Sequence, residues 1–89
     1  MNKIKVTILG CGSSIGVPSL GNNWGNCNPN NPKNRRRRCS ILLEINGFVI
    51  LIDTSPDLRE QLLDADVKRV DAVLFTHGHA DHTHGLDDL

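Results

Sequence analysis

The residues best suited to chemistry lie in one short histidine-rich segment. All four histidines of the 89-residue chain fall within eight consecutive positions, with Asp81 among them: His77, His79, His82 and His84. Imidazole nitrogen binds zinc, iron, copper and nickel, and a carboxylate oxygen extends that range toward manganese. The segment therefore predicts a site for divalent transition-metal ions.

The spacing divides these residues into two pairs. Side chains two positions apart in an extended segment point the same way, so His77 and His79 can reach one ion. Asp81 and His82 follow after the chain has turned, and small residues such as Gly78 permit a tight bend. We expect two ligands for each of two ions. Three roles are possible for His84: a solvated loop residue, a hydrogen-bond partner of a ligand, or a third ligand.

Strands must deliver the chain to this segment. Apolar residues alternate with polar ones over residues 4–8, which predicts a strand with one buried face. Residues 39–45 and 48–53 are rich in β-branched and aliphatic side chains, and the Asn46-Gly47 pair between them favours a type I′ hairpin turn. A further buried strand is predicted over residues 70–75, immediately before the histidines.

One helix is predicted between the last two strands. Ser55 supplies a cap and Pro56 a first-turn residue, and apolar residues then recur at helical spacing as far as Asp66. The glycine-rich residues 10–18 are expected to form a tight loop, and residues 19–34 an irregular excursion without helix or strand. Trp24 in that excursion has two possible roles: it anchors the loop to the core, or it provides a surface on which substrate stacks.

Composition limits the classes of function. Ten basic and ten acidic side chains cancel, so no overall field attracts nucleic acid or a membrane. Three widely spaced cysteines favour reduced thiols over a disulfide framework. The longest apolar run, residues 48–52, is too short to cross a bilayer, and no signal-peptide core follows the first residues. We expect a cytoplasmic protein without a membrane partner.

The pattern His-x-His-x-Asp-His at residues 77–82, placed after a predicted strand, resembles the hallmark motif of the metallo-β-lactamase superfamily. The resemblance implies that His77 and His79 bind one divalent ion, and that Asp81 and His82 bind a second. It implies zinc, with manganese as the alternative. It also implies an α/β fold: the N-terminal part of an αββα sandwich, mainly a mixed β-sheet with one helix.

Other segments are similar to the branch of that family that includes phosphoribosyl cyclic phosphate phosphodiesterase. They are residues 10–18, the arginines Arg35, Arg36, Arg37 and Arg38, residues 51–53 and residues 85–89. The resemblance implies a water activated by two metal ions, acting on a small-molecule phosphodiester or a nucleotide-like substrate. Members of that branch have a cysteine cluster before the basic run, whereas this chain has only Cys27 there. We therefore expect no structural zinc in this loop.

Four ligands are fewer than two catalytic ions need, since a catalytic zinc usually has three protein ligands. In the family the others come from a second half of the fold, so residues 1–89 are expected to form an incomplete domain that is inactive alone. Two hypotheses follow. The chain is half of a hydrolase that needs a complementing C-terminal half, or it is a truncated non-catalytic remnant.

Several supporting roles have two interpretations each. Asp53 is either a hydrogen-bond partner of a ligand or a residue with a purely local bond. The four arginines either bind phosphate or form a solvated lead-in to the hairpin, and nucleic acid binding is left open. The glycine loop is expected to shape the wall of the metal cleft rather than bind nucleotide. Asp87 and Asp88 are expected to begin or cap a helix.

Overall fold

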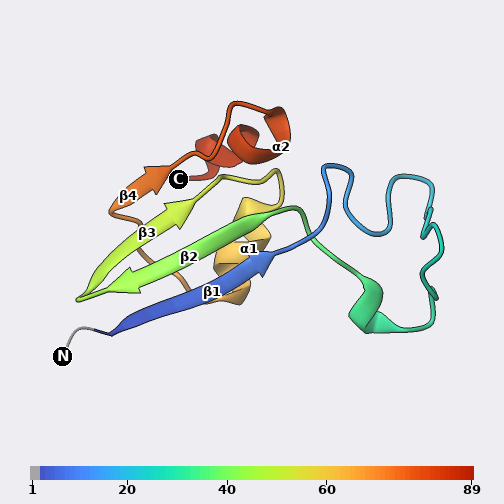
Figure 1. Cartoon of the computed structure of the whole chain (residues 1–89), viewed down its shortest axis with the longest axis horizontal. Helices are drawn as coiled ribbons and strands as arrows, with labels where there is room; N and C mark the ends of the chain where they lie inside the picture. Colours follow the sequence, from blue (N-terminus) through green and yellow to red (C-terminus); the bar gives the residue numbers. More distant parts are fainter. Residues whose placement is uncertain (1–2) are drawn as a thin grey trace.

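Four strands form one mixed sheet in the order β1-β2-β3-β4. The computed structural model describes residues 3–89, so Met1 and Asn2 of the predicted unit lie outside the described residues. The first two pairings are antiparallel and the third is parallel. The strands are β1 (Ile4–Gly10), β2 (Ser40–Ile45), β3 (Phe48–Ile52) and β4 (Ala72–Leu74). The predicted α/β class with a mixed sheet is confirmed (Figure 1).

The hairpin between β2 and β3 is confirmed. Ile45 pairs with Phe48, which leaves Asn46 and Gly47 as the two turn residues. Their φ angles are 50° and 86°, and a type I′ turn requires positive φ at both positions. Asn and Gly tolerate that conformation at little steric cost, so this turn follows directly from the local sequence.

The helices differ from the single predicted one. α1 (Leu58–Asp64) begins three residues after Ser55, because the Ser55 hydroxyl accepts a hydrogen bond from Asp57 N–H at 3.1 Å and holds that segment as a turn. A second helix, α2 (Ala80–Thr83), and a 3-10 helix, η2 (His84–Asp88), follow β4. No helix among the described residues is long and apolar enough to span a membrane.

The excursion at residues 19–34 was predicted to have no helix, and this was wrong at its end. Pro32–Asn34 form a 3-10 turn, η1. Asn31 Oδ1 accepts the Lys33 N–H at 3.0 Å, and Pro32 fixes a φ that suits the turn. Figure 1 shows the excursion extending well away from the sheet.

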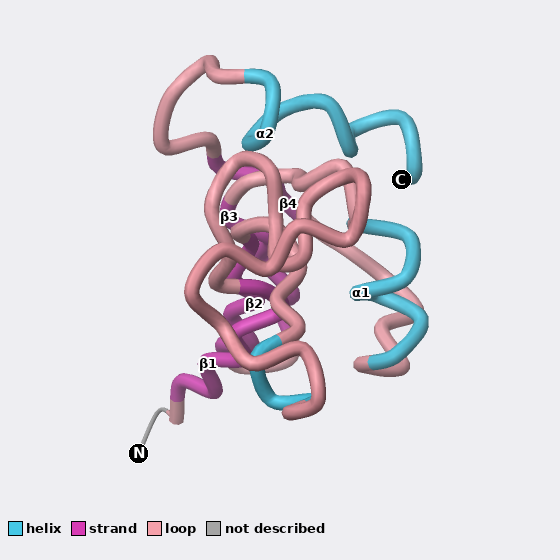
Figure 2. Tube along the Cα trace, turned by 90° about the vertical axis from the view of Figure 1, so that its right-hand side faces the viewer, coloured by secondary structure: helices cyan, strands magenta, loops and turns pink. Residues whose placement is uncertain are grey.

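The core lies between α1 and one face of the sheet, as the side view shows (Figure 2). Leu42, Leu51 and Leu58 are almost completely buried. Leu42 pairs with Leu51 across the hairpin, so their side chains share the face that meets Leu58 of α1. Partly buried side chains complete this cluster: Leu9, Val49, Leu62, Val67, Val70 and Val73.

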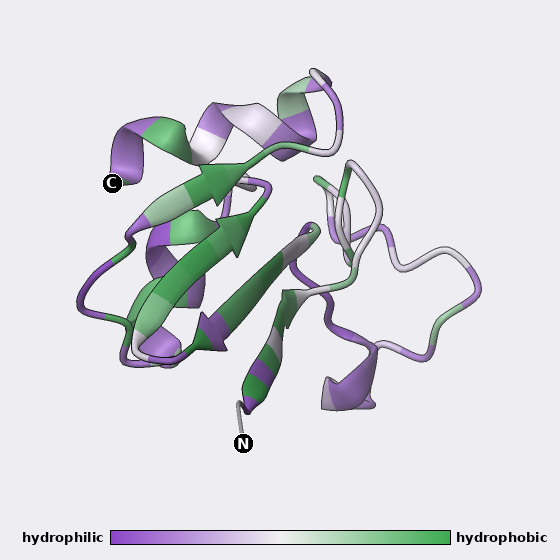
Figure 3. Cartoon of the chain, turned by 60° about the vertical axis from the view of Figure 1, so that its left-hand side comes forward, coloured by the Kyte–Doolittle hydropathy of each residue, from purple (hydrophilic) through white to green (hydrophobic). Residues whose placement is uncertain are grey.

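The opposite face of the sheet, here called the outer face, is apolar throughout. Strand register places on it Ile4, Val6, Ile8, Ile41, Leu43, Ile45, Phe48, Ile50, Ile52, Ala72 and Leu74. Five of these side chains are more than half exposed: Ile4, Val6, Ile8, Phe48 and Leu74. Figure 3 shows how apolar the strands are beside the polar excursion. No described helix covers this face.

β4 is shorter and more exposed than predicted. Only three residues pair with β3, and Leu74 and Phe75 are 56% and 44% exposed. Both side chains are apolar, which is why a buried strand was predicted. However, β4 is an edge strand and Leu74 lies on the uncovered outer face. The prediction of a buried strand was therefore right in type and wrong in burial.

Candidate metal centre

The loop after β3 and the segment after β4 are tied together by backbone hydrogen bonds. Asp53 N–H donates to Leu74 O at 2.8 Å and Thr54 N–H donates to His82 O at 2.8 Å. Gly85 N–H returns a bond to Thr54 O at 3.1 Å. Thr54 is buried, so these bonds fix the histidine segment to the end of the central hairpin.

This arrangement brings the four predicted ligands together. The ring centroids of His77 and His79 lie 4.5 Å apart, and those of His77 and His82 lie 4.1 Å apart. Asp81 Oδ2 lies 3.1 Å from His82 Nε2. His77 and His79 are on the loop that leaves β4, while Asp81 and His82 are on α2, so the turn between the pairs is present.

Asp53 lies at the centre of the supporting hydrogen bonds. Its Oδ2 is 2.7 Å from His82 Nδ1 and also accepts the Thr76 hydroxyl at 2.8 Å, while Oδ1 accepts the Thr76 N–H at 2.8 Å. The carboxylate is 3% exposed, and its backbone has a φ of 65°. A non-glycine residue in this left-handed region is uncommon, and Asp tolerates it better than most.

These bonds determine which ring nitrogens remain available. A carboxylate can only accept, so His82 donates from Nδ1 to Asp53. Thr76 gives its single hydroxyl hydrogen to Asp53, so His77 Nδ1, at 2.8 Å from that hydroxyl oxygen, must be the donor to it. In the neutral imidazoles, the Nε2 atoms of His77 and His82 then carry no hydrogen, and each has a lone pair that can bind a metal ion.

Thr76 is a functional residue that sequence reasoning missed. Its hydroxyl links the ring of His77 to the carboxylate of Asp53. The available signal was its place directly before the first histidine, at the end of a strand. That signal is weak, because threonine is common in strands for its shape alone.

The pKa of the Asp53 carboxyl is held below its ordinary value. Burial acts in the opposite direction and raises the pKa, but the Thr76 N–H, the His82 ring and the Thr76 hydroxyl together outweigh it. The group is therefore a carboxylate at neutral pH, as the hydrogen-bond assignment above requires.

The types of donor atom suit a divalent cation, but the number of donors arranged around one position is too small. His82 Nε2 and Asp81 Oδ2 are two acceptors 3.1 Å apart, a contact that needs a proton or a cation between them. Two ligands of one zinc ion lie about 3–3.5 Å apart, given their bond lengths of about 2 Å. However, no group of three His, Cys, Asp or Glu side chains in residues 3–89 is arranged to hold an ion. Within residues 3–89 the donors are therefore arranged in pairs.

The other residues of the segment lie outside these pairs. His84, Asp87 and Asp88 are exposed and lie in the 3-10 helix η2. Gly78 has no positive φ, and a Cβ there would meet no described atom within 4 Å. An alanine would therefore fit at Gly78 without a steric clash among the described residues.

A hollow opens beside the ligand segment. Asp81 and His84 form one side of it, and Ser14 and Ile15 of the glycine loop form another, with Arg38, Pro56 and Ala80 completing the lining. The glycine loop thus lies along the wall of this hollow. Arg38 is fixed there by Asp57, which accepts bonds from its Nε and Nη2 at 3.0 and 2.8 Å.

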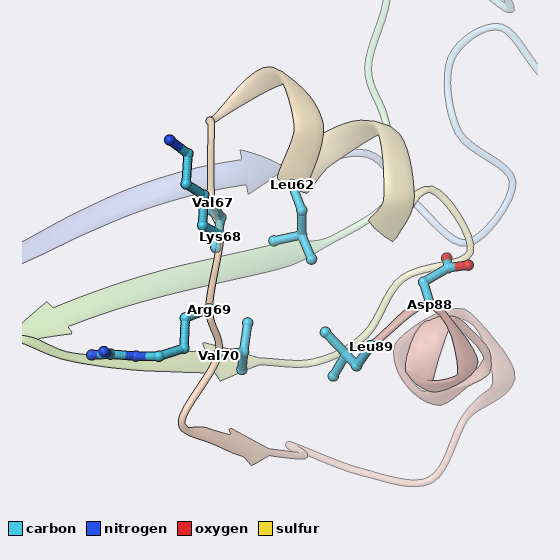
Figure 4. A pocket seen from close by; sticks show the side chains of 7 residues that line it. All are labelled: Leu62, Val67, Lys68, Arg69, Val70, Asp88 and Leu89. Atoms are coloured by element: carbon cyan, nitrogen blue, oxygen red, sulfur yellow. The ribbon is translucent and has the colours of Figure 1, made fainter.

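A separate hollow lies between the end of α1 and η2 (Figure 4). Leu62, Val67 and Val70 form its apolar side, with Lys68, Arg69, Asp88 and Leu89 around it. It shares no lining residue with the histidine segment and brings together no set of side chains suited to catalysis.

A family model described as "Metallo-beta-lactamase superfamily" matches residues 36–89, more than half of the chain. The chain therefore belongs to the metallo-beta-lactamase superfamily. The matched part contains the hairpin, α1 and the whole histidine segment, so the match covers the elements that build the candidate site.

The relatives are much longer than this chain. A crystal structure described as a new diphosphatase from the PhnP family is 45% identical, with a TM-score of 0.87, over 97% of this chain and 34% of that one. An octanoyltransferase of Porphyromonas gingivalis is 45% identical over 97% of this chain and 18% of that protein. A ribonuclease Z of Bradyrhizobium sp. is 37% identical over 65% of this chain and 20% of that protein. The chain thus spans about a fifth of these curated relatives and about a third of the solved one.

Proposed function

We propose that this chain forms the N-terminal part of a metal-dependent hydrolase that cuts a phosphodiester. The observation that carries the proposal is the hydrogen-bonded series His77–Thr76–Asp53–His82, which leaves the Nε2 lone pair of each histidine available to bind a metal ion. A surface cluster of histidines without a function would have no need of a buried carboxylate to orient its rings. Two relatives described as a diphosphatase and a ribonuclease favour a phosphate substrate.

Four side chains would hold the metal ions. His77 and His79 would bind one, and Asp81 and His82 the other, with zinc as the leading ion and manganese as the alternative. When bound, two divalent ions supply an activated water and neutralise the charge on phosphate oxygens. Asp53 and Thr76 orient the rings of His82 and His77, so that both Nε2 atoms are preorganised for binding.

The active enzyme needs further residues from a complementing C-terminal half. Each ion would receive two ligands from this chain, one fewer than a catalytic zinc requires. The outer face supports the same proposal, since no described helix covers its eleven apolar residues. A small-molecule phosphodiester or a nucleotide-like compound is the expected substrate, and the 89-residue chain alone is expected to be inactive.

A chimaera tests the proposal. Residues 1–89 would replace the matching N-terminal third of the PhnP-family diphosphatase, which is 45% identical to them. We expect the product to contain about two metal ions per chain by elemental analysis and to hydrolyse bis(4-nitrophenyl) phosphate. The double substitution His77→Ala and His79→Ala should remove about one ion and the activity, whereas Asp87→Asn, an exposed carboxylate in the same segment, should change neither.

One observation favours a second candidate, a non-catalytic remnant: residues 3–89 contain no arranged group of three metal donors. For a remnant, the chimaera would fold and yet remain without bound metal or hydrolysis. That outcome, with an unmodified diphosphatase active under the same conditions, would replace the first proposal with the second.

A further inference from the structure

Arg38 belongs to a closed ring of hydrogen bonds. Its N–H donates to Asp57 Oδ2 at 2.9 Å, and the Asp57 N–H donates to the Ser55 hydroxyl at 3.1 Å. That hydroxyl donates to Gln61 Oε1 at 2.7 Å, and Gln61 Nε2 closes the ring by donating to Arg38 O at 2.7 Å. Ser55 and Gln61 are almost completely buried, so breaking these bonds would leave polar groups without a partner. The ring therefore fixes both the N–H and the carbonyl of Arg38.

Gly10 permits the ring to close. The closing bond joins Gln61 Nε2 to Arg38 O. A Cβ at position 10 would meet Gln61 Nε2 at 2.5 Å and would collide with Arg38 O. Any side chain at the end of β1 would thus displace one of the two atoms that form this bond.

The guanidinium of Arg38 is held by the same carboxylate as its backbone. Nε and Nη2 donate to the two oxygens of Asp57 at 3.0 and 2.8 Å. This two-bond geometry suits the planar guanidinium, and both side chains are half-buried. Asp57 therefore accepts three bonds from Arg38, two of them from its side chain.

Asp81, a predicted metal ligand, lies close enough to interact with the charge of Arg38. Both residues line the hollow beside the ligand segment. Hydrogen bonds to Asp57 are the main cause that raises the pKa of the Arg38 guanidinium; burial opposes them, and the charges of Asp57 and then Asp81 add to the increase. Within residues 3–89, however, the ion pair of Arg38 is with Asp57, and Asp81 contacts His82 instead.

A released Arg38 would compete with a metal ion for Asp81. A guanidinium can give a carboxylate two hydrogen bonds, which occupy lone pairs that a metal ion would otherwise use. Asp81 Oδ2 and His82 Nε2, 3.1 Å apart, are the pair predicted to bind the second ion. The hollow thus contains a predicted metal ligand and a cation able to occupy it.

We propose that Asp57 is a positioning residue, which keeps the Arg38 guanidinium from pairing with Asp81 and so leaves Asp81 available to a divalent cation. The inference rests on the proposed function, because it requires Asp81 to be a ligand. Asp57 acts through Arg38 and has no contact of its own with the predicted ligands. The ring stiffens this arrangement, since Gln61 fixes the carbonyl of Arg38 and Ser55 fixes the N–H of Asp57.

The restraint on Arg38 can be tested in the 89-residue chain with a chelator present. A double-mutant cycle between Arg38→Gln and Asp81→Asn, measured by chemical denaturation, reports whether the two side chains interact. With Asp57 intact, we expect a coupling of less than about twofold in the unfolding equilibrium constant. In the Asp57→Asn background the released guanidinium should pair with Asp81, and the coupling should rise to about fivefold or more.

The consequence for metal binding can be tested in the chimaera. Asp57→Asn should lower zinc affinity about tenfold, measured by competition with a coloured chelator. Adding Arg38→Gln should restore the affinity, although it cannot restore the stability lost with the ion pair. Arg38→Lys keeps the charge without the two-bond fork and should also lower the affinity, so the test does not depend on whether Asp57→Asn folds.

Asp64→Asn is the matched control. Asp64 pairs with Arg37 of the same run, and Arg37 does not line the hollow that contains Asp81. This variant should change neither the coupling nor the zinc affinity. A lower zinc affinity in Asp57→Asn without the Arg38–Asp81 coupling would be a long-range effect of the lost charge and would overturn the inference. A loss that Arg38→Gln does not reverse would overturn it as well.

The two experiments also separate the inference from the proposed function. Zinc binding and hydrolysis by the chimaera, with the zinc affinity of Asp57→Asn unchanged, would refute the inference alone. Coupling between Arg38 and Asp81 in the Asp57→Asn chain, together with a wild-type chimaera that folds and binds no zinc, would refute the proposed function and leave the restraint on Arg38 established.

Discussion

Asp53 Oδ2 and His82 Nδ1 lie 2.7 Å apart, which joins the end of β3 to the first turn of α2. The contact is buried on the Asp53 side and half-buried on the His82 side. The same carboxylate also accepts both bonds from Thr76. One side chain thus orients two of the four predicted ligands. Its removal should lower metal affinity by more than any accompanying loss of stability would explain.

The first prediction concerns Asp53→Asn in the chimaera. The amide keeps the shape of the carboxylate but removes its charge and presents an N–H in place of one oxygen, so it cannot accept all three bonds that Asp53 accepts from Thr76 and His82. We expect zinc affinity, measured by competition with a coloured chelator, to fall about 10- to 100-fold. Asp66→Asn is the control, because Asp66 is exposed beyond α1 with a φ of 54° that Asn also tolerates. Equal affinities would show that Asp53 has only a local role.

The second prediction compares two glycines of the ligand segment. Gly85 is buried, and a Cβ there would collide with the carbonyl of Ser55 and touch Leu58 Cβ at 3.0 Å. Gly85→Ala should therefore lower the free energy of unfolding by about 1–3 kcal/mol or more. Gly78→Ala should change it by less than about 0.5 kcal/mol. Chemical denaturation measures both, and a large loss in Gly78→Ala would contradict the open surroundings of that residue.

The third prediction uses the Arg38–Asp57 pair, whose side chains are 31% and 27% exposed. Hydrogen bonds from Arg38 are the main cause that lowers the pKa of the Asp57 carboxyl, against a smaller opposing effect of burial. A lowered folded-state pKa stabilises the protein above the ordinary carboxyl pKa, and this stabilisation is lost as pH falls through the folded-state pKa. At neutral pH, Asp57→Asn should cost about 1–3 kcal/mol of unfolding free energy.

The difference between wild type and Asp57→Asn should then shrink as pH falls from about 5 to about 2. Asp64→Asn is the control, because the Arg37–Asp64 pair is more exposed, at 40% and 64%, and such pairs contribute about 0–1 kcal/mol. Thermal unfolding at a series of pH values gives both curves. A difference that stays constant with pH would show that the charge of Asp57 does not stabilise the fold.

The fourth prediction concerns the outer face. Isolated chains should associate through it, because burying one Ile or Val side chain contributes about 1.5–3 kcal/mol. Val6→Thr with Ile8→Thr keeps β-branched side chains in β1 and should reduce association, measured by sedimentation, and binding of an apolar dye. Leu63→Thr removes an equally exposed apolar side chain from α1 and should have little effect. If both changes reduced association equally, the association would be due to exposed apolar side chains in general and not to the outer face.

The local sequence was sufficient for the hairpin and for the type of each strand. Asn46-Gly47 specifies its turn because two consecutive positive φ angles are favourable for few residue pairs. The strand at residues 4–8 was predicted correctly in type, although β1 continues to Gly10. Its apolar face was predicted to be buried, and this was wrong, because Ile4, Val6 and Ile8 lie on the uncovered outer face and are more than half exposed. In contrast, the start of α1 depended on whether the Ser55 hydroxyl would cap the helix or hold the preceding turn, and both use the same type of bond.

The sequence by itself determined the candidate donor set, since four residues of two types, His and Asp, lie in one short motif and define which atoms can bind a metal. It could not determine which ring nitrogens face outward. That depends on Asp53 and Thr76, which are 23 residues apart in sequence and meet only because Leu74 O accepts the N–H of Asp53 at the edge of the sheet. The partners of the arginines were decided in the same way, because Asp57 and Asp64 reach them only when α1 packs against the sheet. The type of a side chain sets which bonds it can form, but the tertiary fold determines which partner lies within reach.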